Sequence, residues 1–388
     1  AVEAGDKPRS WKLPGTNTSI SIGGYVKADL LWDFGARGFL TTGVGPNNGN
    51  NAANNATNGG SWQFHARQSR FFIRTWTPTD WGELATHFEG DFYGLQVRSI
   101  NGPPPNGINT APEFRLRHAY GSLGPVLAGQ TWSTWMPTFA GAETLDFSGA
   151  YSAIFVRQTQ VRYTHHFGGG FFMQFAVENP IRGGLPGVFG GNANSSGNGP
   201  TFINTTGSTK GRIWVGGIFR QLQYDTGTGS GADSAFGWGV SVAGAFRVTK
   251  KVRFGFQGVI GRGVYSYFNG LSPDAVVRPT ADGQGDLDPV LIWGGYIWGQ
   301  YRWTDTIRST VMWSYLKVDI QDSLPSGVSA NSFTTQRVES IQQVFVNLIW
   351  SPVPQVNIGI EYTWFQRGNY AGANFTGNRV HIAFQYSF

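Results

Sequence analysis

The feature that most constrains this chain is an alternation of apolar and polar residues with a period of two, repeated from end to end. The last segment shows it best, because Val380, Ile382 and Phe384 share one face while Arg379 and His381 share the other. Successive side chains of a β-strand point to opposite sides of the sheet. The pattern therefore predicts strands that each have one apolar face and one polar face.

Fifteen segments of strand length follow this pattern. They fall near residues 19–33, 62–76, 83–97, 113–124, 125–133, 154–167, 171–179, 211–224, 235–248, 252–266, 290–305, 307–319, 338–351, 356–367 and 379–388. Short connections such as 168–170 and 352–354 alternate with long ones such as 34–61 and 320–337. Outer-membrane barrels have this rhythm, since their periplasmic turns are short and their outer loops are long.

A barrel with both chain ends in the periplasm needs an even number of strands. Fifteen is odd, and the rhythm of the connections breaks once, between residues 180 and 210. A further strand near 201–206 restores both the parity and the rhythm. We therefore expect an all-β fold, a transmembrane antiparallel β-barrel of about 16 strands. It would span residues 19–388 after a periplasmic lead at 1–18.

Composition agrees with a wall that faces lipid on one side and water on the other. Charged residues make up 13% of the chain, against about 25% in soluble proteins, and aromatic residues make up 15%. No apolar run reaches about 18 residues, so neither a transmembrane helix nor a retained signal peptide is expected. Cysteine is absent, which excludes a disulfide framework.

Tryptophan is spread along the chain in a way that fits a barrel better than a soluble core. Six of the 15 tryptophans lie near the ends of predicted strands, where an aromatic girdle at the membrane surface would place them. They are Trp32, Trp76, Trp81, Trp303, Trp350 and Trp364. The alternative is a soluble β-sandwich with tryptophans in its core, but 15 tryptophans are more than one core would hold.

The polar face predicts a water-filled lumen with more basic than acidic side chains. The net charge is +6 without a dense Lys/Arg block, which fits a basic pore lining better than a nucleic-acid site. The residues predicted to line the pore and set its selectivity are Lys27, Asp29, Arg70, Arg74, Glu89, Asp91, Arg117, Arg162, Arg302 and Glu361. An excess of arginine would favour anions. Alternatively, the arginines pair with lumen acids and stiffen the wall.

The phase of each strand decides which residues face the lumen, and a slip of one residue would reverse it. By alternation Arg157 and Arg262 fall on the lipid side, so either they lie near the rim or the phase changes there. The phase is least constrained near 154–167, 200–224 and 252–266.

The connection at 134–153 is too apolar to lie in water. It contains Trp135, Met136, Phe139, Leu145 and Phe147. We expect it to fold inward as a constriction loop, with Glu143 and Asp146 facing arginines of the wall. The alternative is that it packs at an interface between subunits.

Catalytic signatures are missing, so the chain is not expected to be an enzyme. The sequence holds none of the motifs of lipases, zinc proteases, P-loop proteins or dinucleotide-binding proteins. His87, Glu89 and Asp91 share one strand face, but only strand spacing supports a cation site there. We predict no metal site and no cofactor.

Several segments resemble the DcaP-like porins. Residues 12–29, KLPGTNTSISIGGYVKAD, resemble the start of the first barrel strand in that family. Looser similarity extends over RLRHAY at 115–120, LAGQTW at 127–132, residues 158–163, and VNLIWSP at 346–352 running into NIGIEY at 357–362. The resemblance covers residues 12–388. It implies a homotrimer of 16-stranded channels in the bacterial outer membrane, in contact with lipid and lipopolysaccharide.

The resemblance also implies uptake of small anionic solutes, including dicarboxylates. Members can carry a long N-terminal coiled coil, whereas the lead here has no heptads, so no periplasmic anchoring role is carried over. The expected function is a porin for passive diffusion of small polar, preferentially anionic, solutes. Two alternatives stay open at this point: an unselective diffusion porin, and a barrel that serves as a surface adhesin or scaffold.

Overall fold

The structure is a computed structural model of the 388-residue chain. It describes residues 3–35, 61–94, 114–179, 192–198, 202–208, 211–225, 232–268, 274–279, 285–320, 338–370, 372 and 374–388. No helix within these ranges is long and apolar enough to cross a membrane.

The described residues form one large antiparallel sheet and a small separate hairpin. The strands of the large sheet are β1 (Trp11–Lys12), β2 (Ser19–Gly35), β3 (Ser61–His65), β4 (Arg70–Thr79), β5 (Gly82–Asp91), β6 (Arg115–Leu123), β7 (Val126–Trp132), β8 (Arg157–Gly168), β9 (Phe171–Glu178), β10 (Asn192–Asn198), β11 (Phe202–Ser208), β12 (Gly211–Asp225), β13 (Ala232–Arg247), β14 (Val252–Arg262), β17 (Leu291–Arg302), β18 (Ile307–Asp319), β19 (Val338–Trp350), β20 (Val356–Asn369) and β21 (Asn374–Ser387). The hairpin consists of β15 (Ala275–Pro279) and β16 (Gly285–Pro289).

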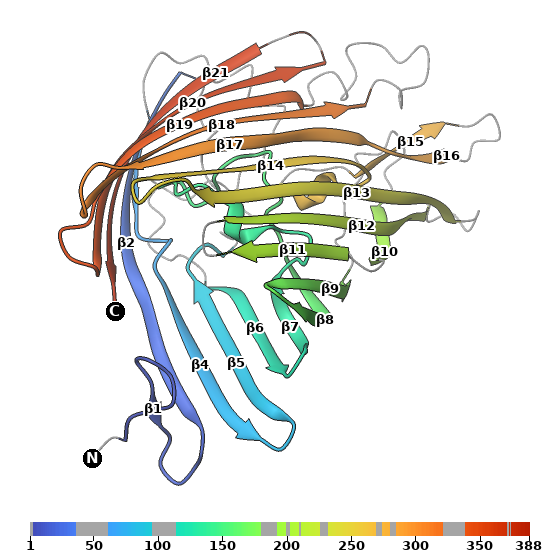
Figure 1. Ribbon diagram of the computed structural model, residues 1–388. Helices are drawn as coiled ribbons and strands as arrows, with labels where there is room; N and C mark the ends of the chain where they lie inside the picture. Colours follow the sequence, from blue (N-terminus) through green and yellow to red (C-terminus); the bar gives the residue numbers. More distant parts are fainter. Residues whose placement is uncertain are drawn as a thin grey trace, which may run out of the picture.

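The strands pair in chain order, and the first pairs with the last. Figure 1 shows this order as a change of colour from the blue β2 to the red β21, which lies beside β2. On its other edge β2 pairs with β3 and β4. The pairing pattern therefore closes on itself, as a barrel requires.

Two strands of the barrel are interrupted. β3 and β4 lie one after the other along β2, and β10 and β11 lie one after the other along β12. With each of these pairs taken as one position and β1 left out, the described strands occupy sixteen positions. β11 also pairs with β9, so it is the strand that connection rhythm predicts near 201–206. The prediction of an all-β barrel is confirmed.

The strand ends differ from the sequence prediction in two places that matter for the lumen. Alternation carries one strand to residue 266, but β14 ends at Arg262, where Gly263 takes a left-handed conformation with φ of +70°. A second strand is expected to begin at residue 154, whereas β8 begins at Arg157. Residues 263–266 and 154–156 therefore leave the wall and turn into the lumen.

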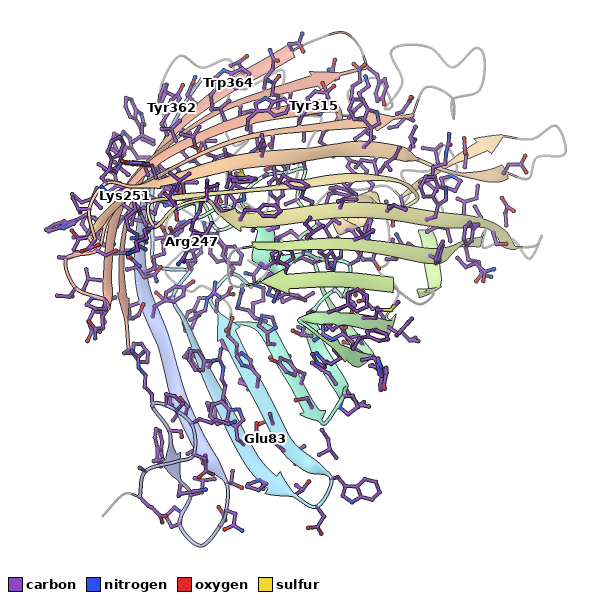
Figure 2. The ribbon with its side chains drawn as sticks, in the orientation of Figure 1. Glu83, Arg247, Lys251, Tyr315, Tyr362 and Trp364 are labelled. Atoms are coloured by element: carbon purple, nitrogen blue, oxygen red, sulfur yellow. The ribbon has the colours of Figure 1, made fainter. Side chains whose placement is uncertain are left out.

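The outer face of the barrel is apolar and exposed. Figure 2 shows Tyr362 and Trp364 projecting from the outside of β20, while Arg247 and Lys251 lie at the turn between β13 and β14. Trp32, Trp81, Trp303 and Trp350 are exposed, in accord with an aromatic girdle. Trp76 is different, because it lies on the inner face and lines a cavity.

The N-terminal lead is tied to the start of the barrel. β1 pairs with the first two residues of β2, and Lys7 forms an ion pair of 2.9 Å with Glu83 at the start of β5. Both contacts lie at the end of the barrel that carries the short turns. The periplasmic position of this lead stays a prediction.

Candidate functional site

A long connection between β7 and β8, residues 133–156, lies against the inner face of the barrel and is called the inner segment from here on. Its first residues are held by a buried carboxylate of β9. Glu178 accepts hydrogen bonds from the Ser133 hydroxyl at 2.8 Å and from the Thr134 backbone N–H at 2.6 Å. Because a buried carboxylate must be hydrogen-bonded to be tolerated, Glu178 fixes where the segment leaves the wall.

The same arrangement recurs near the middle of the inner segment, on the far side of the barrel. Glu361 of β20 is fully buried and accepts backbone N–H groups of Leu145 at 2.8 Å and Asp146 at 3.0 Å. Lys27 of β2 donates to the Leu145 carbonyl at 2.8 Å, and Arg379 of β21 lies 3.4 Å from the Asp146 carboxylate. Charged groups of three neighbouring strands thus hold one turn of the segment.

Between these two anchors the segment follows β12, β17, β18 and β19. The Trp135 indole donates to the Gly216 carbonyl at 3.2 Å, and the Trp298 indole donates to the Ala140 carbonyl at 2.6 Å. Arg308 of β18 forms an ion pair of 2.6 Å with Glu143. A 3-10 turn, η2 (Thr138–Ala140), lies in this stretch. The segment therefore covers the inner face from β9 round to β2.

Apolar packing supports these polar anchors. Trp135, Ala140 and Ile154 of the inner segment are buried in a cluster with side chains of β12, β13, β17 and β18. At Gly239 of β13 an added Cβ atom would lie 2.6 Å from the Trp135 ring, so only glycine leaves room for the indole there. One side of the lumen is consequently filled.

The remaining wall, β4 to β8, carries a cluster of arginines that we call the basic wall: Arg70, Arg74, Arg115, Arg117 and Arg157. Two carboxylates lie among them. Glu89 accepts from Arg117 at 2.6 Å and from Arg70 at 3.2 Å. Asp91 receives two hydrogen bonds from Arg115, of 2.9 and 2.7 Å, and lies 3.0 Å from Arg117.

The other two arginines of the basic wall have no carboxylate partner among the described residues. Arg74 donates to the His87 ring at 2.8 Å. The Nη1 atom of Arg157 is buried and makes no hydrogen bond to a described residue. Five guanidinium groups thus face two carboxylates, which leaves three formal positive charges in excess when histidine is not counted.

A β-bulge in β6 orients part of this cluster. His118 pairs with Glu89, and Leu116 pairs with Gly90, so Arg117 is an extra residue on β6. A bulge of this kind changes the phase of a strand and re-aims a side chain. As a result, the adjacent Arg117 and His118 both lie within 4.0 Å of the Glu89 carboxylate.

Aromatic rings separate the guanidinium groups. Phe147 of the inner segment lies under Arg117, with the guanidinium carbon 4.8 Å from the ring centre, and under Arg70 at 5.5 Å. Trp132 lies under Arg157 at 4.5 Å and under Arg117 at 5.5 Å. Such contacts hold cations apart without neutralising them. The inner segment thus meets the basic wall at Phe147.

A cavity of about 660 Å³ lies between these groups. Its lining includes Arg70, Arg74, Arg117, His87, His118, Trp76, Trp132 and Phe147. Glu89 is the one carboxylate in the described lining. A space of this size, walled by cations and rings, can hold a small anion.

Comparison with known proteins agrees with the fold. A model of the porin subfamily matches residues 11–385. The chain belongs to the porin subfamily. This porin is therefore a channel of the bacterial outer membrane rather than an enzyme, and the resemblance to porins seen in the sequence is confirmed. Among curated proteins no match was found.

Solved structures share the barrel of this porin. The outer membrane channel DcaP of Acinetobacter baumannii has a TM-score of 0.79 at 22% identity, with 99% of this chain and 100% of that chain covered. The anion-selective porin from Comamonas acidovorans has a TM-score of 0.56 at 9% identity, with coverages of 96% and 100%. OmpT of Vibrio cholerae, expressed in the outer membrane, has 0.55 at 11%, with coverages of 97% and 99%. At these identities the likeness shows the fold alone.

Five of the residues that the sequence singles out come together here: Arg70, Arg74 and Arg117 of the basic wall, and the two carboxylates among its arginines, Glu89 and Asp91. Others lie elsewhere on the inner face. Lys27 pairs with Asp29 at 3.0 Å, in the part covered by the inner segment. The selectivity role of all these residues stays a prediction.

Two predicted residues are remote from the basic wall. Arg162 of β8 lines a separate cavity of about 280 Å³ beside the turn between β6 and β7. Arg302 is exposed at the end of β17, where it pairs in register with Arg308. Neither contacts the cluster of five arginines among the described residues.

Sequence reasoning missed three members of the site, His118, Trp132 and Arg157. Strict alternation puts Arg157 on the lipid side, but its guanidinium lies over Trp132, which lines the cavity. Both residues stand at strand ends, next to the inner segment, where the pleat no longer dictates direction. The usable signal was the charge of Arg157, since alternation places it toward lipid, where an arginine is disfavoured.

Proposed function

We propose that this porin passes small polar solutes with a preference for anions, and that the basic wall sets this preference. The observation that carries the proposal is the excess of three positive charges in the basic wall, three of whose arginines, Arg70, Arg74 and Arg117, line a cavity with Glu89 as the one carboxylate of its described lining. At about 8 Å and an effective dielectric constant of about 20, two unit charges interact by about 2 kcal/mol. Three uncompensated charges are thus enough to favour anions over cations at the narrowest point.

The route would run along the basic wall. The inner segment fills the lumen from β9 round to β2, so the remaining passage runs beside β4 to β8, through the cavity that Phe147 lines together with Arg70, Arg74 and Arg117. In this proposal the inner segment is the constriction loop. Glu143 and Asp146, which the sequence places opposite wall arginines, pair with Arg308 and Arg379 and therefore act as anchors.

We further propose dicarboxylates as a solute class and a homotrimer as the assembly, both of which the resemblance to DcaP-like porins implies. Guanidinium groups bind carboxylates through paired hydrogen bonds. Arg74 and Arg157 lie on opposite flanks of the cluster and have no described carboxylate partner, so a solute with two carboxylates could engage both.

The test is a planar bilayer experiment in which the reversal potential is read under a KCl gradient. The variant is Arg74→Gln with Arg157→Gln, because removing these two charges leaves no described carboxylate without its partner. The excess then falls from three charges to one, and the chloride preference should fall with it. Lys251→Gln is the matched control, since it removes one charge from an exposed turn away from the cavity.

The result decides between two kinds of porin. A chloride-selective wild type whose preference is weakened only in the double variant supports the proposal. A potassium-selective wild type, or an unchanged reversal potential in the double variant, contradicts it. Flux that saturates and is blocked by succinate indicates a binding site. Flux that rises linearly with solute concentration favours the unselective diffusion porin.

A further inference from the structure

A second connection also turns into the lumen, although the sequence pattern does not predict this position for it. It joins β14 to β17, and its described residues, 263–268, 274–279 and 285–290, are called the brace. The brace begins with a 3-10 turn, η3 (Tyr265–Tyr267), and its Tyr265, Tyr267 and Phe268 are buried. Three large aromatic side chains so deeply buried in a loop mark it as packed structure rather than a solvated connection.

The brace touches the inner segment near both of its ends. The Phe155 N–H donates to the Tyr267 carbonyl at 2.8 Å, and Ile154 forms an antiparallel bridge with Phe268. Near the other end of the segment, the Trp135 ring packs edge-on against Tyr267, with ring centres 5.5 Å apart. The two ends of the inner segment therefore rest on the same few residues of the brace.

One ion pair fixes the brace to the wall. Arg220 of β12 is buried and donates from Nη1 to Asp274 at 2.8 Å and to the Gly263 carbonyl at 2.7 Å. Asp274 also accepts from the Ser266 N–H and hydroxyl, both at 2.7 Å. Gly263 and Asp274 are thus both bound by the Arg220 guanidinium group, whose central carbon lies 5.2 Å from the centre of the Tyr267 ring.

We propose that Arg220 and Asp274 are positioning residues that set the width of the pore through the brace. The pair fixes residues 263–268, these residues hold both ends of the inner segment, and the segment limits the passage beside the basic wall. Breaking a buried pair leaves an uncompensated charge, so the brace would loosen rather than shift slightly. This inference rests on the proposed constriction by the inner segment.

The primary test is the single-channel conductance of Asp274→Asn, which keeps the volume of the side chain but removes its charge. We expect a higher conductance, more current noise in the open state, and passage of larger neutral polyethylene glycols. The reversal potential should stay close to that of the wild type, because the basic wall is intact. Glu339→Gln is the matched control, since it breaks the half-exposed Lys317–Glu339 pair, which does not contact the brace or inner segment among the described residues.

The absence of cysteine allows a rescue that a merely structural role would not show. Ile154→Cys with Phe268→Cys places two thiols at the bridge between segment and brace, where paired residues of antiparallel strands are near enough for a disulfide. In the Asp274→Asn background, oxidation should return the conductance to the wild-type value, and reduction should raise it again. If the conductance is the same in the oxidised and the reduced protein, the proposal is wrong.

A third variant separates failure of this inference from failure of the constriction itself. Glu361→Ala releases the inner segment at Leu145 and Asp146 without touching the brace. If Glu361→Ala raises the conductance and Asp274→Asn does not, the brace has no part in pore width while the constriction stands. If neither variant raises it, both ideas are wrong. Each variant must first be shown to form a folded barrel, by an electrophoretic mobility that differs between the unheated and the heated sample.

Discussion

The two parts of the inner face differ in what covers them. From β9 round to β2 the wall is hidden by the inner segment, whose backbone is held by Glu178 and Glu361 and whose Trp135 is fully buried. From β4 to β8 the wall is open to a cavity and carries five arginines against two carboxylates. Charge in the covered part anchors the chain, whereas positive charge in the open part exceeds its described carboxylate partners.

The largest expected effect comes from the covered part. Trp135→Ala removes a buried indole, its ring packing and its hydrogen bond to Gly216, at a cost of about 3–5 kcal/mol. The inner segment should loosen and the single-channel conductance should rise, while thermal unfolding in detergent shifts to lower temperature. Trp81→Ala, at a residue that is 84% exposed, is the control and should change neither property. Equal effects of the two variants would remove the distinction between the covered wall and the outside.

The next effect belongs to the open part. Glu89→Gln removes a carboxylate that is paired with Arg70 and Arg117, so the excess of positive charge grows from three to four. We expect a stronger chloride preference, read from the reversal potential, together with lower stability, because Arg70 loses its carboxylate partner and Arg117 keeps only Asp91. Glu361→Gln removes a carboxylate from the covered part and should leave the chloride preference nearly unchanged. A shift toward potassium in Glu89→Gln would contradict the charge balance assigned to the basic wall.

The covered and open parts also differ in how well the sequence predicts them. Alternation correctly predicts the all-β barrel, because a pleated wall between lipid and water forces a period of two, whereas the strand near 201–206 follows from the parity of the strands and the rhythm of the connections. It brings Arg70, Glu89 and Arg117 to one face for the same reason. It fails at His118, since a bulge adds one residue and changes the phase, and no local pattern in residues 115–123 announces the bulge.

The brace shows a different limit of sequence reasoning. Residues 134–153 are recognisable as an inward connection because apolar side chains stand where a solvated loop is expected. Val264, Tyr265, Tyr267 and Phe268 carry the same signal, but alternation extends the preceding strand to residue 266 and conceals it. The glycine at 263, with its positive φ, is what ends the strand, and a single glycine in a glycine-rich chain does not stand out.

A smaller effect is expected where the two parts meet. Phe147→Ala shortens the side chain that lies against Arg70 and Arg117 but leaves the anchors of the inner segment in place. The conductance should rise less than in Trp135→Ala, and the block by succinate should weaken as the passage widens. Phe139→Ala is the control, since its ring lies on the same segment but under Arg212, away from the basic wall. A conductance equal to that of the wild type would show that Phe147 does not border the passage.

The smallest effect concerns pH and the Glu143 anchor. Burial acts to raise the pKa of the Glu143 carboxyl, but hydrogen bonds and charge from Arg308 outweigh it and hold this pKa below its ordinary value. Such a group stabilises the fold above the pKa of the unfolded chain, about 4.3, and this contribution is lost as the pH falls through the lower, folded-state value. The conductance should thus differ little between wild type and Glu143→Gln at low pH, and differ most near neutral pH. The comparison is a pH series of single-channel conductance on both proteins. A wild type that converges on Glu143→Gln already within the ordinary carboxyl range would show that Arg308 does not hold the Glu143 charge, and that this anchor belongs with the solvated rim rather than the covered wall.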